Sequence, residues 1–201
     1  MVKKTDVKAV NEFSCNMEST RSIVVDYIKY RLDSCGYTWD NDGRQANVTA
    51  SPVQTAMRSL GDEFEERFRS RFDELVQQLH VTPDNASETF SAIVAETFCD
   101  GVNWGRIVAL FGFSGRFAVH CFQRNMPNMV DNVVEWVTAY VDTNLREWLE
   151  SHGKWEGFLE FYDGGAESRK NNPWPSFKTI CGYAAAGLGV LTLGAFLAQK
   201  S

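Results

Sequence analysis

The chain has 201 residues, and its 20 basic and 26 acidic side chains give a formal net charge of −6. This negative balance argues against nucleic acid as a partner, because a phosphate backbone attracts positively charged surfaces. With 44% hydrophobic and 13% aromatic residues, the chain can bury a sizeable core, which excludes disorder over most of its length.

The five cysteines do not form a recognisable framework. Their number is odd, and no pair has the C-x-x-C spacing of a zinc or redox site: Cys15, Cys35, Cys99, Cys121 and Cys181. We therefore expect a reducing compartment, with neither disulfides nor a structural zinc ion. The first residues are basic but lack the apolar core of a secretory signal, so we expect no export.

Apolar residues at helical spacing predict a helix over residues 20–36 that ends at Gly36, because glycine favours the backbone turn after a helix. A second helix is expected to begin after Ser51, with Pro52 in its first position and Gln54 completing a capping box. Further helical patterns run over residues 71–80, 84–99, 103–124, 127–144, 144–151 and 154–162. Strand alternation is absent, so the sequence predicts an all-α bundle of about eight helices.

Two of these segments, 104–122 and 129–141, are apolar on most of their circumference, whereas the others are apolar along one stripe. Helices of that kind lie at the centre of a bundle or insert into a membrane. We expect both segments to be central helices of the bundle.

The C-terminal part differs from the rest of the chain. Residues 179–199 carry no formal charge and lie between Lys178 and Lys200. As a helix, about 21 residues extend roughly 32 Å, close to a bilayer core of about 30 Å. Because the preceding stretch is rich in glycine, asparagine and proline, the sequence predicts three parts: a helical bundle over 1–162, a linker over 163–176, and a C-terminal transmembrane helix that acts as a tail anchor over 177–201.

A buried core helix is the alternative for residues 179–199, although such helices are usually shorter, at about 10–14 residues. In the tail, small residues such as Ala185 and Gly189 would permit helix–helix contacts, so a homo- or heterodimer is left open.

The sequence contains no arrangement of residues that is typical of catalysis. His80, His120 and His152 have no helical metal-binding spacing, and no glycine-rich phosphate-binding motif is present. The acidic residues from Asp62 to Glu66 are followed by alternating arginines, which is typical of a solvated helix face with ion pairs. We expect neither an enzyme nor a bound cofactor or metal.

Residues 100–109 have the sequence DGVNWGRIVA, and residues 148–158 have the sequence WLESHGKWEGF. Upstream, VDYIKYRL at residues 25–32 is followed by GYTW at residues 36–39. These segments resemble the first, second and fourth homology motifs of the Bcl-2 family of apoptosis regulators, and the resemblance covers most of residues 20–198. One departure is Lys154, where the family's second motif often has another glycine.

Residues 53–68 resemble the family's third motif, the helix by which death-promoting members bind their relatives. At 100° per residue, its apolar side chains form a stripe less than about 90° wide, and Asp62 lies opposite the stripe. The stripe of this internal death-motif helix consists of Val53, Met57, Leu60, Phe64 and Phe68. Met57 replaces the usual leucine, a swap that nearly conserves volume. We expect the stripe to pack into the bundle as part of a groove wall.

The resemblance implies a bundle around two central helices, with a hydrophobic groove that captures another protein's amphipathic helix. In that groove Arg106 would pair with an acidic residue of the partner, and Gly105 would leave room for its backbone; the alternative for Arg106 is an acid of its own chain. The family's groove positions correspond to Phe64, Phe68, Leu75, Ile93, Glu96, Asn103, Gly105, Arg106, Val108, Ala109, Phe113 and Tyr162. Thr97 and Cys99 depart from the apolar and charged residues common at their positions, which affects partner preference.

Two activities of the family share this architecture. Residues 25–39 and the FLEFY sequence at 158–162 resemble anti-apoptotic members, which sequester the death-motif helices of pro-apoptotic relatives. Residues 109–113, together with Arg116, His120 and Gln123, are similar to the pore-forming effectors. We expect the anti-apoptotic activity, at the cytosolic face of the mitochondrial outer membrane, with the endoplasmic reticulum membrane as a further site and part of the protein in the cytosol.

Overall fold

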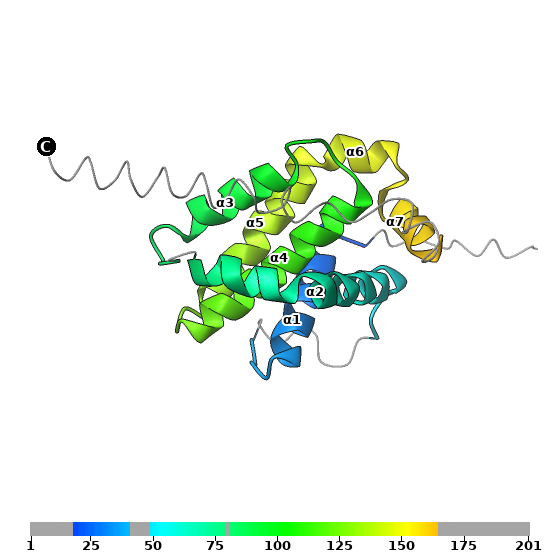
Figure 1. The fold of residues 1–201 in the computed structure, drawn as a ribbon. Coiled ribbons are helices and arrows are strands. Elements are labelled where there is room, and N and C mark those ends of the chain that lie inside the picture. Colours follow the sequence, from blue (N-terminus) through cyan, green and yellow to red (C-terminus); the bar gives the residue numbers. More distant parts are fainter. Residues whose placement is uncertain (1–17, 41–48, 79–80, 165–201) are drawn as a thin grey trace, which may run out of the picture.

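A computed structural model describes residues 18–40, 49–78 and 81–164 of the chain, with only the backbone described for residues 71–73 and 75–78. These ranges form seven α-helices and no strands (Figure 1), which confirms the all-α prediction for this part of the chain. The helices are α1 (Thr20–Ser34), α2 (Pro52–Gln78), α3 (Ala86–Thr97), α4 (Trp104–Gln123), α5 (Met129–Asn144), α6 (Arg146–Ser151) and α7 (Lys154–Asp163).

Several predictions concern residues beyond these ranges. The predicted tail anchor over 177–201, including Ala185 and Gly189, lies outside the described residues, as does the predicted linker from residue 165 onward. Within the described ranges, no helix combines the length and apolar character needed to cross a bilayer.

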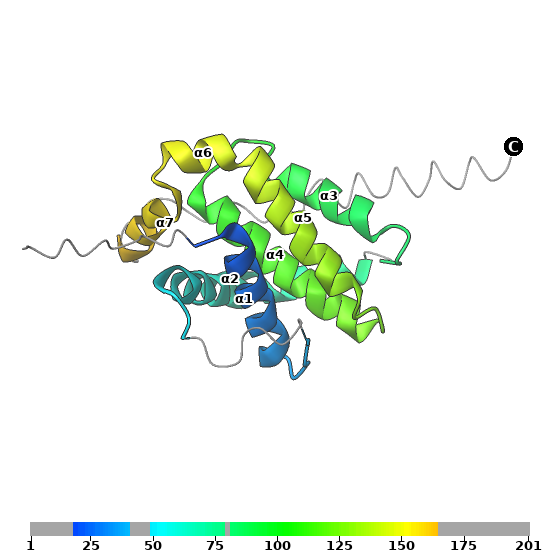
Figure 2. The same ribbon diagram turned by 180° about the vertical axis from the view of Figure 1, so that it is seen from behind.

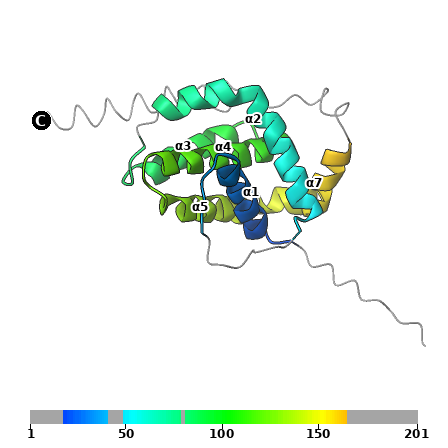
Figure 3. The same cartoon turned by 90° about the horizontal axis from the view of Figure 1, so that it is seen from below.

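Helix α4 lies between α2 and α5 and packs against both of them (Figure 3). Helix α1 contacts α2, α4 and α5. Helix α3 lies at the opposite end of the bundle from α6 and α7 (Figures 1 and 2). Because α7 also packs against α2, the two helices that carry the predicted second and third motifs are neighbours.

Helix ends follow the local signals in the sequence. The Ser51 hydroxyl accepts a hydrogen bond from the Gln54 backbone N–H at 3.1 Å, and the Gln54 side-chain oxygen accepts one from the Ser51 backbone N–H at 2.9 Å. This is the predicted capping box. After α1, Gly36 has a φ of +80°, and the backbone N–H of Tyr37 bonds back to the carbonyl of Leu32 at 3.0 Å. The predicted glycine terminator is therefore confirmed.

The predicted separate helix over residues 71–80 is wrong, because α2 continues without a break from Pro52 to Gln78. The described residues consequently contain seven helices and not eight, and residues 79–80 lie outside them. The physical reason is that no proline lies between Pro52 and Pro83, so nothing in this span removes an amide donor from the helix.

The two segments predicted to be central differ from each other. Helix α4 is buried on all sides, including polar positions such as Ser114 and His120. Helix α5 buries one stripe of valines, whereas Asp131 and Glu135 on its other side are exposed. Helix α4 is thus the central helix that the sequence predicts, whereas the interleaved acidic side chains of α5 keep one of its faces in water.

Candidate functional site

The start of α4 is fixed by local backbone and capping chemistry. Gly101 has a φ of +101°, a conformation that side-chain-bearing residues rarely adopt. Two residues later, the Asn103 side chain accepts a hydrogen bond from the backbone N–H of Arg106 at 2.9 Å and so caps the helix. These contacts place Gly105 and Arg106 in the first turn of the central helix.

Arg106 is buried and already holds partners within its own chain. Its Nη1 donates to the carbonyl oxygen of Gly101 at 2.5 Å, and its Nη2 donates to Asp100 Oδ2 at 3.2 Å. The Arg106 side chain is 10% exposed and the Asp100 side chain 64% exposed. The buried Nε atom of Arg106 has no partner among the described residues. The internal acid considered from the sequence is therefore present, and it leaves Nε of the guanidinium without a partner in the described part of the chain.

Cys99 and Glu96 lie near the Arg106–Asp100 ion pair. The Sγ atom of Cys99, in the stretch between α3 and α4, lies 3.7 Å from Oε1 of Glu96 in the last turn of α3. Desolvation together with the negative charges of Glu96 and Asp100 raises the pKa of the Cys99 thiol. The surface beside Arg106 therefore carries the negative charges of Glu96 and Asp100.

Most of the apolar residues predicted to line a groove belong to the hydrophobic core. In the described side chains, the rings of Phe64 and Phe68 on α2 lie 4.9 Å apart, and Phe113 on α4 lies 5.4 Å from Phe90 on α3. The buried members are Phe64, Phe68, Ile93, Val108, Ala109 and Phe113. The structure thus brings the apolar members from three helices into one cluster.

The remaining predicted residues are placed differently. Glu96, Asn103, Gly105 and Tyr162 are partly exposed. The hydroxyl of Tyr162 on α7 donates to Ser59 Oγ on α2 at 3.4 Å, which joins these two helices. The side chain of Leu75 lies outside the described residues, so its position relative to the others stays a prediction.

The internal death-motif helix forms the first half of α2. Its predicted stripe is buried throughout: Val53, Met57, Leu60, Phe64 and Phe68. On the opposite side, Asp62 accepts hydrogen bonds from Tyr30 Oη at 2.5 Å and from Arg31 Nη1 at 2.8 Å. The amphipathic helix is confirmed, and its acidic residue is held by α1.

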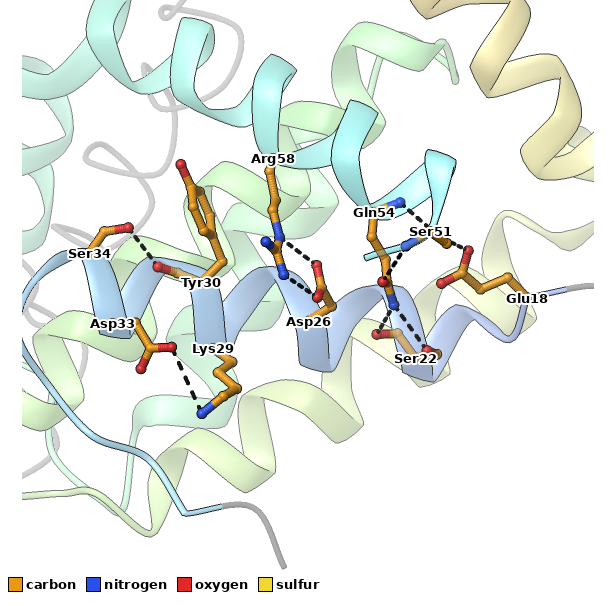
Figure 4. Close-up of polar contacts among 10 residues, drawn as sticks. All are labelled: Glu18, Ser22, Asp26, Lys29, Tyr30, Asp33, Ser34, Ser51, Gln54 and Arg58. Atoms are coloured by element: carbon orange, nitrogen blue, oxygen red, sulfur yellow. Dashed lines mark hydrogen bonds and ion pairs between the residues drawn. The ribbon is translucent and has the colours of Figure 1, made fainter. Parts of the chain in front are cut away.

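A row of polar contacts continues this connection toward the start of α2. Arg58 Nε donates to Asp26 Oδ2 at 2.9 Å, and the two groups face each other as a bidentate pair (Figure 4). The Gln54 side chain donates to Ser22 Oγ at 3.2 Å. We call the contacts between residues 22–31 of α1 and residues 54–65 of α2 the α1–α2 polar seam.

The prediction that residues 62–66 form a solvated face is wrong for Glu65. This carboxyl is buried and pairs with Arg31, which is itself buried. Burial raises the pKa of the Glu65 carboxyl, and the positive charge of Arg31 opposes that shift. No local sequence pattern signals this packing, because Arg31 and Glu65 are 34 positions apart and meet only when α1 packs on α2.

The glycine beside Asp62 has a packing role. A Cβ atom at Gly61 would lie 2.3 Å from Oη and 2.5 Å from Cε2 of the fully buried Tyr27. Similarly, a Cβ atom at Gly112 of α4 would lie 2.7 Å from Cδ1 of Phe64. Glycine at these positions allows α1 and α4 to approach α2 closely. The helix of the third motif therefore packs tightly against its neighbours in this bundle.

The comparisons with known proteins all indicate the same protein family. A family model described as apoptosis regulator proteins of the Bcl-2 family matches residues 57–155. Bcl-2-like protein 1 of Gallus gallus is 40% identical, with 90% of this chain and 99% of that protein covered. Apoptosis regulator R1 of Xenopus laevis is 37% identical, with 90% and 79% covered. Bcl-2-like protein 1 of Homo sapiens is 31% identical, with 91% and 99% covered.

The chain belongs to the Bcl-2 family of apoptosis regulators. In this Bcl-2 family member, the aromatic residues of the first and second motifs form one cluster, in which the ring of Trp104 lies 4.8 Å from Trp148 and 5.5 Å from Phe158. Lys154 has a φ of +54° and follows Gly153 at +77°. The lysine thus adopts a backbone conformation suited to the glycine common in the family.

Proposed function

We propose that this Bcl-2 family member is anti-apoptotic: it sequesters the amphipathic death-motif helices of pro-apoptotic family members and so prevents permeabilisation of the mitochondrial outer membrane. The binding groove would be formed by α2, α4 and α7, which carry the third, first and second motifs. Capture of a helix in a groove is a general recognition mode of which this family is itself a standard example. The observation that carries the proposal is a buried Arg106 at the start of the central helix, whose Nε has no partner within residues 18–40, 49–78 and 81–164.

The chemistry of this site suits an amphipathic helix that presents one carboxylate to Arg106. Each apolar side chain that a partner buries against the α2 and α4 wall contributes about 1.5–3 kcal/mol. A carboxylate from the same helix would accept charge-assisted hydrogen bonds from Arg106, which fixes the orientation and register of the helix. Next to Arg106, Gly105 has no side chain to obstruct the approaching backbone.

The α1–α2 polar seam favours the anti-apoptotic activity over the effector activity. A pore-forming effector must release buried helices from their neighbours before they insert into a bilayer. Here α1 holds α2 through the Asp26–Arg58 and Arg31–Glu65 ion pairs, and Asp62 accepts from two α1 side chains. Separating these helices would leave buried charges without partners, which is costly.

Peptide binding tests the groove assignment. The full-length chain in lipid nanodiscs is titrated into a fluorescent amphipathic peptide carrying four apolar anchors and one aspartate, and anisotropy is measured. We expect Arg106→Ala and Gly105→Glu to weaken binding at least tenfold. Arg124→Ala is the matched control, because it removes an exposed charge at the other end of α4. Equal affinity in all four proteins would refute the groove.

Dye release from liposomes separates the two activities. Liposomes with the lipid composition of the mitochondrial outer membrane are incubated with the full-length chain and an activating death-motif peptide. We expect no release by the chain alone or with peptide, and we expect protection when a known pore-forming effector is added. Release by the chain itself would identify it as an effector.

We also propose that residues 177–201 anchor the chain in the mitochondrial outer membrane with the bundle in the cytosol. The support is the uncharged stretch between Lys178 and Lys200, which is long enough to span a bilayer. Cell fractionation and microscopy with and without residues 177–201 test this proposal. Residence at the endoplasmic reticulum would favour the alternative membrane, and unchanged membrane association after the deletion would refute the anchor.

A further inference from the structure

The side-on edge of the Arg106 guanidinium, formed by Nε and Nη2, can bind a partner carboxylate through two hydrogen bonds, and Asp100 already contacts one of these two atoms. Nη1 is committed to the Gly101 carbonyl at 2.5 Å. A carboxylate that binds the unpartnered Nε takes Nη2 as its second donor, because these two atoms present parallel N–H groups along the side-on edge of the guanidinium. Nε is unpartnered among the described residues, but Nη2 donates to Asp100 at 3.2 Å.

We propose that Asp100 is an intramolecular competitor that occupies the Nη2 position of Arg106 and is exchanged for the partner's carboxylate on binding. This inference rests on the proposed function of the site. It adds that the affinity for an acidic helix is limited by a residue of the chain itself, and that Asp100 sets how strongly the site selects partners that carry an acid.

The geometry makes the exchange inexpensive for Asp100 and favourable for Arg106. The Asp100 side chain is 64% exposed, so its carboxylate can turn into water without losing much solvation. Arg106 exchanges one hydrogen bond to Asp100 for two to the partner while it keeps the Gly101 contact. The competing pair is weak because one partner is exposed, so removing it should change affinity by about two- to fivefold.

The test is a double-mutant cycle in which one substitution is made in the chain and one in the peptide. Asp100→Asn in the full-length chain is compared with wild type for binding of the aspartate-bearing peptide and of the same peptide with asparagine at that position. Asp131→Asn is the matched control, because it removes another exposed acid, in the first turn of α5, and changes the net charge by the same amount. Thermal melting of each variant verifies that the fold is intact.

We expect Asp100→Asn to bind the aspartate peptide about two- to fivefold more tightly than wild type, with no gain for the asparagine peptide and none in Asp131→Asn. Asp100→Glu, which keeps the charge, should remain near wild type. An equal gain for both peptides, or equal gains in Asp100→Asn and Asp131→Asn, would overturn the exchange while leaving the groove assignment intact. If neither wild type nor Asp100→Asn binds either peptide, the proposed function fails and the exchange fails with it.

Discussion

The hydroxyl group of Tyr30 on α1 donates a hydrogen bond to Asp62 on α2 over 2.5 Å. Asp62 is the acidic residue of the internal death-motif helix, and the apolar stripe on the other side of that helix is buried in the core. Both faces of the motif are therefore engaged within the chain. The same helix that resembles a ligand serves here as a structural wall.

Removing the Tyr30 hydroxyl should destabilise the bundle. We expect Tyr30→Phe to lower the free energy of unfolding by about 1 kcal/mol, because a hydrogen bond to a half-exposed carboxylate is lost. Urea denaturation followed by circular dichroism measures the change. In a double-mutant cycle with Asp62→Asn, the two effects should be less than additive. Strict additivity would mean that the two groups do not interact in solution.

Adding a methyl group at Gly61 should cost more. The Cβ atom of alanine would lie 2.3 Å from Tyr27 Oη, and the Tyr27 ring is fully enclosed. We expect Gly61→Ala to lower the free energy of unfolding by about 1–3 kcal/mol, with part of the loss recovered when Tyr27→Phe removes the nearest atom. Thr55→Ala, at an exposed position of α2, is the control and should not destabilise. A neutral Gly61→Ala would show that α1 can shift freely.

The lysine in the left-handed region offers a stabilising substitution. Lys154 has a φ of +54°, which costs a non-glycine residue about 1 kcal/mol. We expect Lys154→Gly to raise the free energy of unfolding by about that amount, as measured by thermal melting. Glu156→Gly in the first turn of α7 should do the opposite, because its backbone is helical. The prediction fails if both glycine variants are destabilised equally.

Stability should fall in mild acid because of His120. Burial and the positive charge of Arg124 lower the pKa of His120 in the folded chain, and its Nε2 has no partner among the described residues. The unfolded chain, with a histidine pKa of about 6.5, therefore takes up a proton first as the pH falls. The stability that neutral His120 contributes is present above that pH and is lost progressively below it.

Urea denaturation at pH 7.5 and pH 5.5 measures this effect. We expect the loss of stability between the two pH values to be smaller in His120→Gln than in wild type. His152→Gln, at an exposed position, should retain the wild-type loss. The same loss in all three proteins would assign the acid sensitivity to other groups.

Features set by neighbouring residues could be predicted from the sequence. Ser51 with Gln54, and Gly36 after α1, act through backbone groups within a few residues, so their chemistry does not depend on the rest of the fold. The stripe of the death-motif helix is likewise a property of one helix.

Features that depend on which helices meet were missed. Arg31 and Glu65 are 34 positions apart, and the burial of Glu65 follows from the packing of α1 on α2, which no local pattern encodes. The one-sided burial of α5 was missed for a similar reason, since the hydrophobicity of a segment does not say how many neighbours surround it. At the candidate site, the sequence indicated Arg106, but its commitment to Asp100 and Gly101 depends on the loop conformation.

The closed loop at the start of α4 also bears on binding kinetics. Gly101, the Asn103 cap and the Arg106 contacts order this segment when the chain folds. Binding therefore does not carry the entropy cost of ordering this segment. Only the partner helix and the Asp100 side chain need to rearrange. Encounter should then proceed at similar rates for different helices, and their residence times should distinguish strong partners from weak ones.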